Sequence, residues 1–170
     1  MKKYEFTGET KRVELWNRTA TLHRIKATVE FGFVKVGELG GWIEKEENLS
    51  HEGKAWVWGN AKVWGNAKVC GDAKVWGNAE VCGDAEVWGN AEVFLASHVL
   101  VMGSVGSRND FTTFFRDKDN EITVKCGCFL GKIDKFLEKV TQTHGNNKYA
   151  LVYRAAVEVA KLQIELTERK

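Results

Sequence analysis

The sequence predicts a mainly β protein: a short solenoid of parallel strands with a β cap before it and an α+β unit after it. Three observations predict this architecture. Residues 55–93 repeat the pattern A-x-V-x-G-[ND] every six residues, the chain contains no proline, and amphipathic helical spacing is found near the C-terminal end. A period of six fits neither a helix nor a plain strand, but a solenoid can place one short strand and one corner in each repeat.

These patterns divide the 170 residues into three parts. We predict an N-terminal β cap over residues 1–40, the solenoid over residues 41–102 and an α+β C-terminal domain over residues 103–170. The cap and the C-terminal domain are expected because a solenoid exposes unpaired strand edges at both ends.

The strict positions of the repeat define the interior of the solenoid. Ala and Val lie two residues apart in every repeat, and residues two apart on a strand face the same way. They therefore point inward, the residues flanking Val point outward, and Gly-Asn or Gly-Asp forms the corners because these residues tolerate positive φ. An interior of Ala and Val is filled, so we expect any ligand to bind outside it.

The residue before each Val sets the length of one coil. This position changes from Lys to Glu half-way along the repeat: Lys62, Lys68, Lys74, Glu80, Glu86 and Glu92. A coil of three hexapeptides stacks every Lys on a Glu, whereas a coil of two hexapeptides would stack like charges on adjacent strands. The charges therefore predict triangular coils that contain three hexapeptides each.

The residue after each Val points outward and is often aromatic. With 18-residue coils, Trp58, Trp76 and Phe94 stack on one face. We predict that this face is a subunit interface, because a contiguous apolar patch of that size is rare on a monomer. The alternative is aromatic stacking that stiffens a solvated sheet. The other two faces carry Trp64, Cys82 and Leu100, and Cys70 and Trp88.

The C-terminal part changes in character. The segments FTTFFR and EITVKCGCF are predicted to form a hairpin through DKDN, with Cys126 and Cys128 continuing its buried face. Helices are expected over residues 132–143 and 148–167, with Asn147 capping the second. We interpret an apolar stripe as the buried face of the second helix, and expect Val157 and Ile164 on another buried side. The stripe consists of Val152, Ala155, Val159, Leu162 and Leu166.

A polar cluster after the repeat is the candidate ligand site. Paired arginines bind phosphate or carboxylate through forked hydrogen bonds, and the start of the second helix adds amide donors for an anion. The alternative is a polar loop whose side chains bond the local backbone. The candidate residues are Arg108, Asn109, Asp110, Thr113, Arg116 and Lys148.

Other chemistry is less well supported. Cys126, Cys128 and His144 lack an apparent fourth ligand for zinc, so we predict packing roles and no metal. His98 is expected to point outward in register with Glu80. It is either an ordinary surface residue that completes the Lys62–Glu80 ladder or, as the best candidate among the histidines, a general base.

The composition and charge of the chain argue against some classes of binding partner. The net charge of +2 does not favour nucleic acid or an anionic membrane, and no apolar run approaches the length of a membrane span. Four cysteines without secretory context suggest the cytosol.

Four motifs outside the repeat, together with the repeat itself, carry a resemblance to known proteins. They are YEFTGETK (4–11), LGGWIEKEENLS (39–50), GSRNDFTTFFR (106–116) and THGNNKYA (143–150). The repeat resembles that of hexapeptide-repeat proteins with a left-handed parallel β-helix, and the whole chain resembles small phage- and prophage-encoded proteins. The left hand rests on this resemblance, because the general crossover rule favours the right hand.

The resemblance implies a homotrimer in the host cytosol without a cofactor. It suggests a non-enzymatic binding protein that sequesters a small anionic, nucleotide-like host defence signal, or a host protein. Two alternatives stay open: an acyltransferase-like enzyme that uses His98, and a structural scaffold or polymer.

Overall fold

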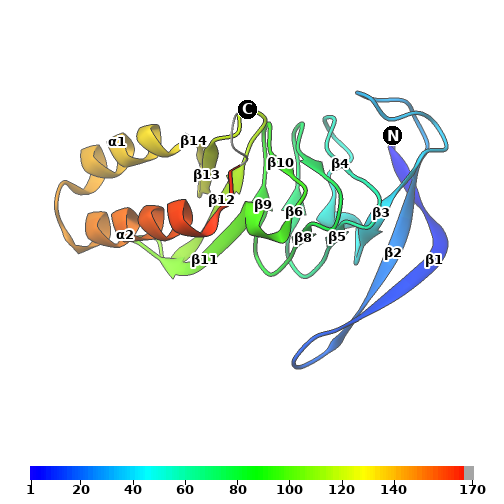
Figure 1. Ribbon diagram of the computed structural model, residues 1–170, viewed down its shortest axis with the longest axis horizontal. Helices are drawn as coiled ribbons and strands as arrows, with labels where there is room; N and C mark the ends of the chain where they lie inside the picture. The colour runs from blue at the N-terminus through cyan, green and yellow to red at the C-terminus, as the bar shows by residue number, and fades with distance from the viewer. Residues whose placement is uncertain (167–170) are drawn as a thin grey trace.

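The computed structural model describes residues 1–166 and is mainly β, with two helices at the C-terminal end (Figure 1). The N-terminal strands are β1 (Tyr4–Glu14), β2 (Thr19–Ala27) and β3 (Leu39–Ile43). Seven two-residue strands follow: β4 (Trp56–Val57), β5 (Lys62–Val63), β6 (Lys68–Val69), β7 (Lys74–Val75), β8 (Glu80–Val81), β9 (Glu86–Val87) and β10 (Glu92–Val93). The C-terminal elements are β11 (Val99–Val105), β12 (Asp110–Arg116), β13 (Ile122–Cys126), β14 (Phe129–Lys132), α1 (Ile133–His144) and α2 (Lys148–Gln163).

The two-residue strands pair in parallel, each with the strand three hexapeptides further along the chain. Lys62 pairs with Glu80, Lys68 with Glu86, and Lys74 with Glu92. The strands thus form three stacks, β3-β5-β8, β4-β7-β10 and β6-β9. This register confirms the offset that the Lys-to-Glu change predicts, and it is consistent with a β-helix.

The interior of the repeat region (residues 55–94) is made of the strict Ala and Val positions. Every one of these Ala and Val side chains is fully buried, as the two-residue spacing predicts. The corner glycines of the repeats have φ between 58° and 71°, a region that side-chain-bearing residues rarely adopt. The interior is therefore filled, and any ligand of the repeat region must bind outside it.

Both ends of the repeat region are covered. At the N-terminal end, β1 and β2 form an antiparallel hairpin that joins β3 at the edge of the first stack (Figure 1). The hairpin also covers one outer face, where Ala20 and Leu22 pack on Trp64. At the C-terminal end, β12 contacts β9 and β10, and Phe115 closes the interior, fully buried.

The C-terminal part is a four-stranded antiparallel sheet in the order β11-β12-β13-β14, with α1 and α2 packed together at its side. The predicted hairpin is β12 and β13, with Phe114 opposite Val124. The ββαα prediction missed β14 and β11. The sheet begins at Val99, before the predicted boundary at residue 103, because β11 follows the last repeat after only one short helical turn.

Two predictions about buried faces were wrong. Cys128 is exposed, because the strand ends at Cys126 and Gly127, with φ of 56°, starts a turn. The predicted apolar stripe of the second helix is exposed, and its last member, Leu166, lies beyond the end of α2. The opposite face packs against the sheet and α1 instead, through Ala150, Tyr153, Ala156, Val157, Ala160 and Ile164.

The helix boundaries follow the predicted signals. The Asn147 side chain accepts hydrogen bonds from the backbone N–H groups of Tyr149 and Ala150, at 2.9 and 3.1 Å, which satisfies two free donors at the start of α2. Gly145 ends α1 with φ of 57°. The predicted second helix extends to residue 167, which lies outside the described residues, whereas α2 ends at Gln163.

Candidate functional site

A groove of about 540 Å³ lies along the seam, the line where β12 and β13 meet the repeat region. One wall comes from the repeat region and the short helical turn at Glu46–Asn48, and the other from the start of β12 and the end of β13. We call it the seam groove. Its lining includes Lys45, Glu47, Lys68, Asp84, Asp110 and Phe111.

Lys68 is the lysine of the seam groove that has no polar partner among the described residues, in a lining that holds three lysines and four carboxylates. In the other two columns the stacked pairs form ion pairs, Lys62 to Glu80 at 2.6 Å and Lys74 to Glu92 at 3.0 Å. In the third column, Glu86 instead contacts Lys125 of β13, with 3.1 Å between Nζ and Oε2. Among residues 1–166, the Lys68 ammonium therefore makes no hydrogen bond or ion pair, although its strand pairs with that of Glu86.

The rest of the seam groove is polar with one aromatic ring. The Asn66 side chain bridges two charged residues of the lining. Its Nδ2 donates to the Asp84 carboxylate at 3.1 Å, and its Oδ1 accepts from the Lys45 ammonium at 3.4 Å. Glu47 and Asp110 add carboxylates. The Phe111 ring is 42% exposed at the rim. The groove thus offers the Lys68 ammonium, hydrogen-bond acceptors and an aromatic face, the groups that a nucleotide-like ligand engages.

Part of the predicted ligand cluster lies at this groove. Asp110 lines it, and Asn109 precedes it in an exposed turn with φ of 52°. The Arg108 guanidinium lies beside Gly127, also in the lining, so closely that a Cβ added to Gly127 would be 2.9 Å from Arg108 Nη1. Thr113 is buried behind the groove, where its Oγ1 accepts a hydrogen bond from the Glu86 backbone N–H at 2.9 Å.

Arg116 and Lys148 are not part of the same site. Arg116 is buried at the seam, where it donates to the Glu92 carbonyl at 3.1 Å and to Asn120 Oδ1 at 3.0 Å, and lies over the Phe94 ring. Lys148 is exposed at the start of α2. The six predicted residues therefore do not converge, and ligand binding by them stays a prediction.

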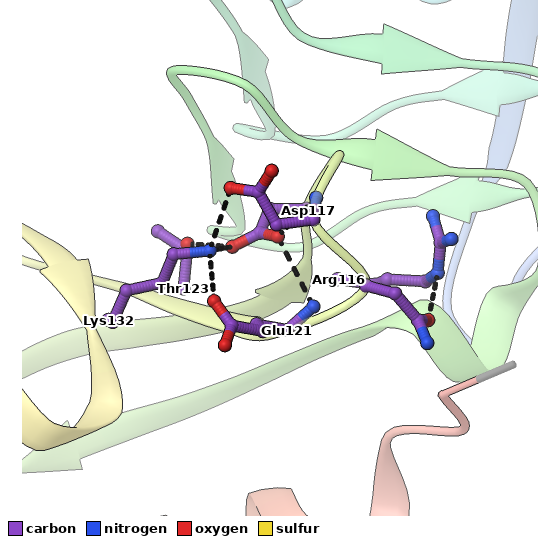
Figure 2. Close-up of polar contacts among 7 residues, drawn as sticks. Arg116, Asp117, Glu121, Thr123 and Lys132 are labelled. Carbon is purple, nitrogen blue, oxygen red and sulfur yellow. Dashed lines mark hydrogen bonds and ion pairs between the residues drawn. The ribbon is translucent and has the colours of Figure 1, made fainter. Parts of the chain in front are cut away.

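The β12–β13 segment was predicted only as a turn, but it holds a cluster of interacting polar side chains, which we call the hub (Figure 2). Asp117 is buried, and its carboxylate accepts from Lys132 Nζ at 2.6 Å, from Thr123 Oγ1 at 2.5 Å and from the backbone N–H of Glu121 at 3.2 Å. Lys132 also contacts Glu121 at 2.7 Å. The Lys132 ammonium thus offsets part of the charge of the three carboxylates in this turn, and we expect the cluster to stabilise the seam.

The pKa values in the hub follow from these contacts. Burial alone would raise the pKa of Asp117, but the hydrogen bonds from Lys132, Thr123 and the backbone outweigh it and lower that pKa. Burial likewise opposes the charge of Lys132, and the hydrogen bonds to Asp117 and Glu121 outweigh it and raise the pKa of Lys132. Both groups are therefore charged at neutral pH.

The predicted aromatic column is present. Trp58 and Trp76 have ring centroids 6.1 Å apart, and Trp76 and Phe94 are stacked at 5.6 Å. The chain itself covers part of each ring: Trp58 Nε1 donates to Glu38 at 3.0 Å, and Arg116 lies over Phe94. The stacking is confirmed, whereas the role of this face as an interface stays a prediction.

The expectation for His98 was wrong. Its side chain is 1% exposed, and its ring meets the edge of Phe94 with 4.3 Å between centroids. The regular repeat that would have placed His98 above Glu80 ends before it is reached, and a short helical turn, Ala96–His98, directs its side chain inward. Burial, followed by the nearby Arg116 charge, lowers the pKa of His98. A buried imidazole is a poor general base for an external substrate.

Comparison with known proteins gives no assignment: no protein-family model and no curated protein matches the chain. Within residues 1–166, no cluster of three or more His, Cys, Asp or Glu side chains could hold a metal ion. In the same described range, every helix is too short or too polar to cross a membrane.

Proposed function

We propose that this chain is a non-enzymatic binding protein that holds a small anionic, nucleotide-like ligand in the seam groove. The observation that carries the proposal is that Lys68, an exposed residue in the lining of a groove of about 540 Å³, has no polar partner among the described residues while Lys125 occupies Glu86. That volume falls in the range of about 300–1,000 Å³ that is usual for small-molecule sites.

The other groups of the groove favour a nucleotide over a simple anion. Lys68 and the neighbouring Arg108 suit phosphate. The exposed Phe111 ring suits a base, since stacking on an aromatic contributes about 1–3 kcal/mol. Glu47 and Asp110 would repel a bare anion but accept hydrogen bonds from ribose hydroxyls or amino groups. A ligand with both phosphate and hydrogen-bond donors satisfies both sets.

The type of β-helix, the biological source of the ligand and the oligomeric state are also proposals. The repeat region is a left-handed parallel β-helix that serves as the scaffold, and the three parallel stacks with an offset of three hexapeptides support this assignment. The ligand class that we propose is a host defence signal, by analogy with the phage- and prophage-encoded proteins that the sequence motifs resemble. The predicted homotrimer stays a prediction, to be tested by native mass spectrometry.

Isothermal titration calorimetry tests the proposed ligand class. We would titrate mononucleotides, cyclic mononucleotides and cyclic dinucleotides, with inorganic phosphate for comparison. Lys68→Gln should weaken the binding of a nucleotide by about ten- to a hundredfold, the effect of losing a charged hydrogen bond worth about 1.5–3 kcal/mol. Lys62→Gln is the matched control, because it occupies the same repeat position on another face. The proposal fails if no nucleotide binds, or if both variants weaken binding equally.

A further inference from the structure

A second pocket, of about 340 Å³, lies on the face of the repeat region that carries the β4-β7-β10 stack. We call it the corner pocket, because its lining combines a column of corner residues with the turn around Phe33. Its main lining residues are Phe33, Lys54, Trp58, Asp72, Asn90 and Lys118. Within residues 1–166 it has no lining residue in common with the seam groove, so it is a separate candidate site.

The corner column departs from the repeat pattern at both ends. The pattern places Asn or Asp after each corner glycine, as at Asp72 and Asn90, but at the first position of this column it is replaced by Lys54. Lys118, in the β12–β13 turn, continues the column, because its backbone N–H donates to the Asn90 carbonyl at 3.0 Å. Among the described residues, the side chains of Lys54, Asn90 and Lys118 are exposed and make no hydrogen bond or ion pair. The column thus offers two ammonium groups and an amide.

The turn around Phe33 adds an aromatic surface. Phe31 and Val34 exchange backbone hydrogen bonds at 3.1 and 2.9 Å, and this tight turn leaves the Phe33 side chain 82% exposed. The Lys74 ammonium lies 5.6 Å from the centroid of the Phe33 ring, and Trp58 supplies a second ring to the lining. Aromatic faces beside cations suit a ligand that has a flat apolar part as well as an anionic one.

Lys118 is the cation of the corner pocket whose charge is least offset. In the column, Asp72 follows directly on Lys54 and offsets its charge, whereas the neutral Asn90 separates Asp72 from Lys118. The two aspartates that flank Lys118 in the sequence contact Lys132 instead. An anion in the pocket is therefore best placed between the Lys118 ammonium and the Asn90 amide, both of which donate hydrogen bonds.

We propose that the corner pocket binds an aromatic monocarboxylate. Its carboxylate accepts hydrogen bonds from Lys118 and Asn90, and its ring lies against Phe33. Three lysines and two carboxylates line the pocket, so one negative charge on the ligand balances the lining. The volume lies at the lower end of the range of about 300–1,000 Å³ that is usual for small-molecule sites, which favours a small molecule over an extended peptide. The proposal does not depend on the ligand of the seam groove.

Amide NMR spectra of the full chain test this ligand class. The probes are naphthoate and naphthamide, which share the ring and differ in charge, each added up to millimolar concentration. Naphthoate should shift the backbone amide signals of Gly32 and Lys118 and the side-chain amide signal of Asn90, and naphthamide should shift them much less. Signals of the corner pocket that do not move with naphthoate, or that move equally with both probes, overturn the proposal.

Substitutions test the roles of the individual side chains. Lys118→Gln should weaken naphthoate binding by about tenfold, the loss of a charged hydrogen bond, and Lys54→Gln should weaken it less. Phe33→Ala should weaken the binding of both probes, because it removes the ring surface. Lys139→Gln, at an exposed lysine of α1, is the matched control and should bind as the wild type does. Equal effects of Lys118→Gln and Lys139→Gln overturn the proposal, and the same spectra show that the variants fold.

Discussion

Lys125 contacts Glu86 across the seam, with 3.1 Å between Nζ and Oε2, and so takes the carboxylate that the repeat register offers to Lys68. The same ammonium lies over the Trp88 ring, 4.9 Å from its centroid. A residue of β13 thus changes the charge balance on one face of the repeat region. The Lys68 ammonium is left to the seam groove because the C-terminal sheet docks where it does.

A pair of double-mutant cycles should reveal this exchange of partners. We expect a coupling free energy of about 1 kcal/mol between Lys125 and Glu86, which are partly buried, and a value near zero between Lys68 and Glu86. The cycles use Lys125→Met, Lys68→Met and Glu86→Gln, with urea unfolding as the measurement. The Lys62–Glu80 pair provides the reference for an ordinary stacked pair. A larger coupling for Lys68 than for Lys125 would contradict the structure.

Asp117→Asn should lower the free energy of unfolding by about 3 kcal/mol, because the change removes a buried carboxylate and leaves Lys132 without its main partner. Asp119→Asn, a more exposed contact of the same ammonium at 3.3 Å, should cost less than about 1 kcal/mol. Urea unfolding of the two variants measures both losses. Equal losses from the two substitutions would show that the hub does not hold the seam.

The acid stability of the protein should depend on the same residue. The pKa of Asp117 is lowered in the folded state, so the unfolded chain binds its proton first as the pH falls. Its contribution is complete above about pH 4, the ordinary range for an aspartate, and is lost as the pH falls through the folded value. Thermal unfolding from pH 6 to pH 2.5 should therefore show a steeper loss for the wild type than for Asp117→Asn.

Lys3 should give the protein an unusual alkaline stabilisation. Its ammonium is buried at the N-terminal end of the repeat region, where it donates to the Ala55 carbonyl at 2.7 Å. Burial lowers the pKa of Lys3 from 10.5 to about 8. The unfolded chain therefore binds more protons between pH 8 and pH 10.5, and stability rises with pH over this window, by up to about 3 kcal/mol.

Chemical unfolding at pH 7.5, 9 and 10.5 measures this effect. The increase in the free energy of unfolding with pH should be absent in Lys3→Met. It should be present in Lys2→Met, which changes an exposed neighbouring lysine. Tyrosines that titrate in the same range are common to all three proteins and cancel in the difference. If Lys3→Met follows the wild-type curve, the buried ammonium is not the cause.

Two glycines test how tightly the first coil is packed. A Cβ added to Gly41 would lie 2.6 Å from the Ala61 carbonyl oxygen and 2.7 Å from Val57 Cγ1, so Gly41→Ala should cost about 3 kcal/mol or more. Gly59 has φ of 58° with open space around it, and Gly59→Ala should cost only about 1–2 kcal/mol of backbone strain. Thermal melting compares the two; the reverse order would contradict the packing.

The structure of the repeat region was predictable because the same short pattern occurs many times, and each copy indicates the same strand pairing. All the charged residues that precede Val agree on one offset, and Lys62 and Glu80 form the ion pair that this offset implies. The second helix was harder, because it is apolar on two faces. The face with Tyr153 and Val157 is the one that packs on the sheet, and the sequence does not contain the position of that sheet.

The candidate site depended on contacts between distant parts of the chain. Arg108 and Asp110 were found from their own chemistry, and they do lie at the seam groove. Lys68 was missed, because the register pairs it with Glu86 and only the docking of β13 takes Glu86 away. Thr113 and Arg116 were predicted to bind a ligand because they are polar. The structure buries them at the seam, where polar residues also serve to join two parts of the chain.

The closed ends of the repeat region constrain how this gene can change in length. The N-terminal hairpin covers the face of Trp64, and Phe115 closes the other end. In the proposed β-helix, a duplication of one or two hexapeptides would rotate one end against the other by a third or two thirds of a coil. A duplication of three hexapeptides keeps every column aligned. Recombination within the repeated DNA should therefore leave viable variants that differ by multiples of three hexapeptides, the offset at which the strands pair.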